Sequence, residues 1–140
     1  MTQENKELLL QDLCGRIPYG VKCEVYDRIG ILDEISSFGS AVNYNNGEDT
    51  TCRIECVKPY LFPLSSMTEE QKIECFKGTD IELDEYNEIW STFPISNSDI
   101  ALTNLNNWLK VINWLNKNHF DYRGLIEKGL AIDCTNLNIY

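Results

Sequence analysis

The sequence predicts an α+β fold in which residues 1–140 form one compact unit. A chain of 140 residues has the common length of a single domain, and its 43% hydrophobic content is typical of a globular protein. Short segments that alternate between apolar and polar residues fill the first half, and amphipathic helical patterns stand near both ends. An alternative division places a sheet-rich part at residues 1–64 and a helix-rich part at residues 65–140.

The first element is expected to be a helix from about Glu4 to Cys14. Its apolar stripe consists of Leu9, Leu10 and Leu13. Gly15 can supply the left-handed residue that ends a helix, and Pro18 and Gly20 then predict a turn.

Four short extended segments follow and predict a strongly bent antiparallel sheet or a small open β-barrel. The segments are Val21–Tyr26, Ile29–Ile35, Val42–Tyr44 and Thr51–Val57. Gly30 is the expected site of a bulge or bend in the second segment. Asn45-Asn46-Gly47 predicts a hairpin between the last two, because Asn and Gly tolerate positive φ.

The middle of the chain combines an extended segment, a helix and a second hairpin. The prolines of Pro59–Leu64 argue against a central strand, so this segment is expected to cross the sheet and pack beneath the next helix. Ser66–Glu69 matches a capping box and predicts a helix over Met67–Lys77, ended by Gly78. Ile81–Phe93 is expected to form a second small hairpin.

A long amphipathic helix is predicted from Asp99 to about Asn118. Its buried face is formed by Ala101, Leu105, Trp108, Leu109, Ile112 and Leu115, spaced by three and four. A polar turn should lead to a short helical segment over Arg123–Lys128, which Gly129 ends. The remaining residues are expected to form a docked C-terminal tail.

The formal net charge of −10 argues against direct binding of DNA or RNA, because that affinity comes chiefly from Lys and Arg that neutralise phosphates. Neither of the glycine-rich phosphate-binding patterns occurs, so no nucleotide cofactor is predicted. Cys52 and Cys56 would lie ~13 Å apart on a regular strand, which is too far for a single zinc ion, and no metal site is expected.

The N-terminal segment and the cysteines indicate a cytoplasmic protein. Acidic residues stand where a signal peptide needs positive charge, and no apolar run approaches the ~20 residues of a membrane helix. In a reducing compartment the six cysteines are expected to remain thiols, and most of them to serve as small core residues.

A segment around the single histidine is the strongest candidate for a ligand site. Its polar residues are Lys117, His119, Asp121, Tyr122 and Arg123. Lys117 and Arg123 could bind a phosphate while Tyr122 stacks on a base, which suggests a nucleotide-type signal as ligand. Alternatively, His119 caps the end of the long helix, or it works with Cys134 and dispersed carboxylates in a hydrolase.

Carboxylates concentrate in the middle of the chain. They are Glu69, Glu70, Glu74, Asp80, Glu82, Asp84, Glu85 and Glu88. Such a run is usually a solvated face. It could also imitate a phosphate backbone and occupy a basic groove on a protein partner.

Three stretches resemble a family of small uncharacterised proteins from Bacteroides-type gut bacteria and their phages or mobile elements. They are Ile17–Lys22, Lys58–Gln71 and Asn116–Ile126. The resemblance implies a setting in host–phage or mobile-element biology and assigns no reaction or residue role. Together with the missing catalytic constellation, it favours a non-enzymatic protein, an accessory or inhibitory factor that acts on a host protein, over a small-ligand binder or a hydrolase.

Overall fold

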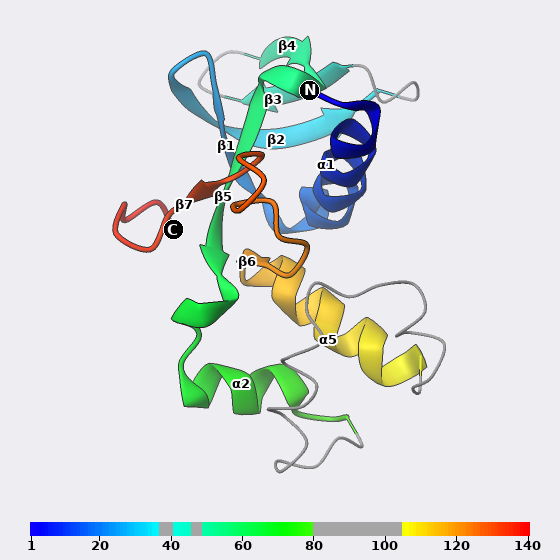
Figure 1. The fold of residues 1–140 in the computed structure, drawn as a ribbon, viewed down its shortest axis with the longest axis vertical. Helices are drawn as coiled ribbons and strands as arrows, with labels where there is room; N and C mark the ends of the chain where they lie inside the picture. Colours follow the sequence, from blue (N-terminus) through cyan, green and yellow to red (C-terminus); the bar gives the residue numbers. More distant parts are fainter. Residues whose placement is uncertain (37–40, 46–48, 80–104) are drawn as a thin grey trace.

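A computed structural model describes residues 1–36, 41–45, 49–79 and 105–140 and has a mixed α+β fold (Figure 1). The N-terminal helix α1 (Gln3–Arg16) lies beside a sheet at one end of the molecule. Helices α2 (Glu69–Phe76) and α5 (Leu105–Lys117) lie at the other end, and strand β5 (Val57–Pro63) runs from the sheet toward them. The predicted α+β class is confirmed.

Helix α1 is longer than predicted, because Gly15 lies inside it and does not end it. Thr2 caps its start by accepting a hydrogen bond from the N–H of Asn5, at 3.2 Å. A Cβ on Gly15 would lie 2.9 Å from the side-chain nitrogen of Asn116. Glycine at this position therefore lets α1 approach α5 closely. The left-handed residue is Gly20, which follows a short 3-10 turn.

The sheet has seven strands and is mixed, where an antiparallel sheet is predicted. The other strands are β1 (Lys22–Val25), β2 (Arg28–Ile35), β3 (Ala41–Asn45), β4 (Asp49–Arg53), β6 (Phe120–Asp121) and β7 (Ile132–Asp133). The order is β4-β3-β2-β1-β5-β6, and β7 also pairs with β5. The first five strands pair antiparallel, but β6 and β7 pair parallel to β5. Both parallel strands follow α5, so the C-terminal segment returns across the molecule before it joins the sheet.

Two details of the first strands differ from the prediction. Gly30 pairs regularly with Cys23, and the register shift lies between Leu32 and Glu34. The predicted fourth strand breaks after Arg53 into a 3-10 turn over Ile54–Cys56, so the alternation of its cysteines does not continue along one strand. The strands on either side of the predicted Asn45-Asn46-Gly47 turn pair antiparallel, as a hairpin requires, but residues 46–48 lie outside the described residues.

The prediction that Pro59–Leu64 does not form a central strand is wrong. Strand β5 pairs with β1 on one side and with β6 and β7 on the other. Its bonds to the C-terminal strands use the N–H of Phe62 and the carbonyl of Leu61. Neither bond needs the N–H that a proline lacks, so both prolines fit within the strand.

Helix α2 begins two residues later than predicted, because the capping box is formed by Thr68 and Gln71. The described part of helix α5 begins at Leu105, because the predicted start at residues 99–104 lies outside the described residues. The predicted hairpin over Ile81–Phe93, which includes Trp90, also lies outside them. A long C-terminal helix is therefore not confirmed. Residues 125–129 form turns where a short helix is predicted, and Gly129 has a positive φ of 70°.

The buried side chains form two clusters. The first lies between α1 and the sheet and includes Leu9, Val25 and Leu61. The second joins α2 and α5 to the end of β5, and includes Phe76 and Leu115. Neighbouring residues of β5 contribute to both clusters, so this strand connects them. Within the described ranges, no helix is long and apolar enough to span a membrane.

Candidate functional site

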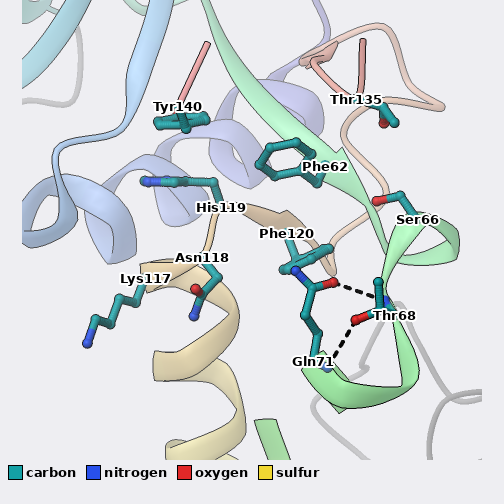
Figure 2. A pocket seen from close by; sticks show the side chains of 10 residues that line it. All are labelled: Phe62, Ser66, Thr68, Gln71, Lys117, Asn118, His119, Phe120, Thr135 and Tyr140. Atoms are coloured by element: carbon teal, nitrogen blue, oxygen red, sulfur yellow. Dashed lines mark hydrogen bonds between the residues drawn. The ribbon is translucent and has the colours of Figure 1, made fainter. Parts of the chain in front are cut away.

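A pocket of about 400 Å³ lies where the end of β5, the start of α2, the end of α5 and the C-terminal segment meet (Figure 2). Its lining residues are Phe62, Ser66, Thr68, Gln71, Lys117, Asn118, His119, Phe120, Thr135 and Tyr140. This volume is in the range that holds a small organic molecule.

One wall of the pocket is set by the parallel pairing of β5 with β6. Phe62 and Phe120 are register partners, and their ring centroids lie 5.8 Å apart. The N–H of Phe62 donates to the carbonyl of His119 at 2.9 Å. Trp114 of α5 stacks on Phe120 with an interplanar angle of 13°. Backbone bonds and ring packing therefore hold this wall from two elements.

A stacked pair of rings forms a second wall. The rings of His119 and Tyr140 lie 3.9 Å apart at an interplanar angle of 9°. His119 adopts a left-handed conformation with φ 61°, two residues after the end of α5. The Tyr140 hydroxyl donates to the carbonyl of Tyr60 at 3.1 Å and accepts from the N–H of Lys22 at 2.9 Å. These bonds fasten the C-terminal residue to the sheet and fix its ring against the histidine.

His119 contributes to the pocket as an uncharged ring. Burial, with the nearby positive charges of Arg16 and Lys22, lowers the pKa of His119 from 6.5 to about 4. The imidazole is therefore neutral at physiological pH. Figure 2 shows the nitrogen-bearing end of the ring pointing away from Phe62, and its buried Nδ1 has no hydrogen-bond partner in the described chain. The alternative prediction was a charged His119 that caps the end of the long helix; the residue does lie near the end of α5, but its charged form is disfavoured there.

The neutral polar residues of the lining are held by local hydrogen bonds. The Thr68 hydroxyl accepts from the N–H of Gln71, and the Gln71 side-chain oxygen accepts from the N–H of Thr68. The Ser66 hydroxyl donates to the carbonyl of Pro63, and the Asn118 amide donates to the carbonyl of Trp114. These groups are thus fixed in place, and their oxygens keep lone pairs that can accept from a ligand.

Only two of the five predicted ligand residues, Lys117 and His119, line the pocket. Asp121 is buried, and its carboxylate accepts from the backbone N–H groups of Arg123, Leu125 and Ile126. This carboxylate organises the turn that follows β6 and is not the partner of the imidazole.

Tyr122 and Arg123 are also absent from the lining. The Tyr122 ring is buried, with the guanidinium of Arg16 5.5 Å and that of Arg123 5.0 Å from its centroid. Because arginine already faces this ring, it offers no surface for a base to stack on. The predicted phosphate-and-base arrangement is therefore not assembled.

A completely buried ion pair, Asp12 with Arg16, is bonded to the backbone of the lining residue Phe120. Arg16 Nε donates to Asp12 at 2.7 Å, and Nη2 donates to the same carboxylate at 2.9 Å. The Nη2 group also donates to the carbonyl of Phe120 at 2.8 Å, and Arg123 Nε lies 3.7 Å from Asp12. The pair thus connects α1 with the pocket wall formed by β6.

The cysteines show no sign of an activated thiol. All six are free, and Cys23, Cys52, Cys75 and Cys134 are buried, as predicted for core residues, whereas Cys14 is exposed. Burial, with the negative charge of Asp133, raises the pKa of Cys134 to about 11, so this thiol stays protonated at neutral pH. Among the described residues no group of three His, Cys, Asp or Glu side chains could hold a metal ion.

The predicted acidic surface is described only in part. Glu69, Glu70 and Glu74 are exposed on α2, and Glu69 forms an ion pair of 3.0 Å with Lys72. Asp80, Glu82, Asp84, Glu85 and Glu88 lie outside the described residues. Whether this run contacts a partner stays a prediction.

Most of the lining was not recognised in the sequence. The residues missed are Phe62, Ser66, Thr68, Gln71, Asn118, Phe120, Thr135 and Tyr140. The available signals were the capping pattern before α2 and the predicted docking of the tail, and neither indicated a shared cavity.

Because comparison with known proteins found no match, the functional proposal is based on the fold and the pocket. No protein-family model, no curated protein and no solved structure matches this chain.

Proposed function

We propose that this protein is a non-enzymatic binding protein for a small planar organic molecule, which occupies the pocket between β5, α2 and α5. The observation that carries the proposal is a cavity of about 400 Å³ with four aromatic or imidazole rings among its lining residues. Flat rings favour stacking with a planar ligand, and the surrounding hydroxyl and amide groups can fix its orientation. Because its pKa is lowered to about 4, His119 is only a weak base, and the Cys134 thiol stays protonated at neutral pH. Neither group is an effective base or nucleophile, which favours binding over turnover.

The geometry changes the expected class of ligand. A nucleotide needs cations around its phosphates, but Lys117 is the single Lys or Arg in the lining. Arg123 is engaged with Tyr122 and Asp12 instead. We therefore favour an aromatic ligand without a polyphosphate over the nucleotide-type signal.

A pocket-filling substitution tests the proposal. Thr135 is exposed and lines the pocket, whereas its exposed neighbour Asn136 does not. We expect the neutral fluorescent probe N-phenylnaphthylamine to bind the unaltered protein and to raise its melting temperature. At a free concentration of about 100 times its Kd, a ligand adds about 2.7 kcal/mol to the free energy of unfolding. The Thr135→Trp variant should lose this binding because the indole occupies the cavity.

Asn136→Trp is the matched control, since it adds the same side chain one residue away. It should bind the probe as the unaltered protein does. Equal binding by both variants, or no binding by the unaltered protein, would contradict the assignment of the pocket as a ligand site.

A second candidate function, binding of a protein partner, rests on three exposed apolar side chains of the β1–β2 hairpin, Tyr26, Ile29 and Ile31. These side chains are 64%, 49% and 42% exposed. Ile29 and Ile31 share the outer face of β2, because they alternate with the buried Gly30 and Leu32. Tyr26 has a positive φ of 50°, a conformation that costs a non-glycine residue about 1 kcal/mol or more. An exposed tyrosine kept in such a conformation is consistent with a role in recognition.

If these exposed side chains bind a protein partner, charged substitutions on the outer face of β2 should abolish capture of that partner. In pull-downs from a host lysate, the double variant Ile29→Asp/Ile31→Asp should lose a stoichiometric partner that the unaltered protein retains. Ile73 is an equally exposed isoleucine on α2, so Ile73→Asp is the matched control and should retain the partner. Retention by the double variant, with its circular dichroism unchanged, would exclude this face. The resemblance to proteins of phages and mobile elements suggests a bacterial lysate as the source.

A further inference from the structure

Among the described residues, the lining of the pocket has no acidic side chain although the chain is strongly acidic. The chain has 22 Asp and Glu against 12 Lys and Arg, but none of the ten lining residues is Asp or Glu. Lys117 is the one described lining residue whose side chain carries a permanent charge, because the imidazole of His119 is neutral at physiological pH. The described lining therefore carries one positively charged side chain and no negatively charged one, although the chain as a whole is acidic.

Lys117 is available to a ligand. Its side chain is exposed, and its ammonium makes no ion pair or hydrogen bond with any described residue. By contrast, Lys6 and Lys72 pair with glutamates, and Lys22 donates to the carbonyl of Ile139. In Figure 2 Lys117 lies beside Asn118 and below His119, and its ammonium points away from Phe62 and Phe120. Its flexible four-carbon stem lets the ammonium reach a group at the pocket mouth.

We infer that the ligand is a planar aromatic monoanion, with a carboxylate or sulfonate group that pairs with Lys117 while its ring system packs against the aromatic walls. This inference rests on the proposed binding function of the pocket. A side-chain carboxylate in the lining would repel such an anion, and the described part of the lining has none. A single cation in the lining balances one negative charge, which excludes the polyphosphates that need several.

The inference is tested with two fluorescent probes that share one skeleton. Anilinonaphthalene sulfonate carries a negative charge, and N-phenylnaphthylamine lacks the sulfonate. The Kd of each probe is measured on the full chain and on the variants Lys117→Gln and Lys128→Gln. Lys128 is exposed, has no side-chain partner among the described residues and lies outside the lining, so it is the matched control.

We expect the unaltered protein to bind the sulfonate more tightly than the neutral probe. Lys117→Gln should weaken sulfonate binding about fivefold, the upper range for an exposed ion pair, and leave the neutral probe unchanged. Lys128→Gln should change neither. Equal affinities of the unaltered protein for the two probes, or a Lys117→Gln variant whose preference for the sulfonate is undiminished, overturn the anion inference but leave the pocket as a binding site. Failure of both probes to bind, or binding that Thr135→Trp does not affect, overturns the proposed function and the inference together.

Discussion

Replacing Arg16 by methionine is expected to lower the free energy of unfolding by about 3–5 kcal/mol, because it leaves the carboxylate of Asp12 buried without its partner. Both side chains of this ion pair are fully buried, and three hydrogen bonds depend on the guanidinium. Arg123 lies 3.7 Å from Asp12 and compensates only in part. Urea denaturation followed by tryptophan fluorescence measures the effect as a lower midpoint.

Two further variants separate charge burial from a general loss of packing. Asp12→Leu/Arg16→Met removes both charges and should recover most of the stability, since an apolar pair of similar volume is tolerated where a lone charge is not. Lys6→Met removes the exposed pair with Glu55 and should leave the midpoint nearly unchanged. A single Arg16→Met variant as stable as the unaltered protein would show that the pair is not buried as described.

Acidification from neutral pH is expected to destabilise the protein through His119. The unfolded imidazole has a pKa of 6.5, and in the folded protein burial, Arg16 and Lys22 lower the pKa to about 4. Between these values the unfolded state binds a proton that the folded state does not. The stabilisation is therefore complete above pH 6.5 and is lost as the pH falls toward 4.

The single histidine of the chain makes this test direct. Histidine is the side chain whose ordinary pKa lies between about 5 and 8. The urea midpoint of the unaltered protein should fall between about pH 7.5 and about pH 5, whereas His119→Gln should show a nearly flat profile over this range. Comparing slopes removes any constant effect of the substitution on packing. Parallel profiles for the two proteins would mean that His119 is solvated and titrates normally in the folded state.

Local sequence patterns predicted most elements but not all of their boundaries. Alternating residues identified β1 and β2, and leucine spacing identified α1. The start of α2 was misplaced because Ser66–Glu69 and Thr68–Gln71 match the same capping pattern, and the structure uses the second. The turn at Tyr26 and Asp27 was not expected, because both residues adopt positive φ without the Asn or Gly that normally signals such a turn.

Other features depend on contacts between distant segments. Asp12 and Arg16 have the i,i+4 spacing of a surface pair on a helix, and only the approach of β6 buries them. Strand β5 becomes central because the C-terminal segment returns to pair with it. The pocket contains His119, around which the sequence predicted a ligand site, together with aromatic residues of β5 and of the C-terminus. No local pattern brings Phe62, His119 and Tyr140 together.

The most direct test of the account is a titration of the isotope-labelled protein with N-phenylnaphthylamine, followed by amide chemical shifts. The account predicts saturable shifts centred on the amides of Phe62, Gln71, Asn118 and Phe120, with the outer face of β2 unchanged. Shifts centred on Ile29 and Ile31 while the pocket amides stay unchanged, or no saturable shift at any amide, would contradict the claim that this cavity is the binding site.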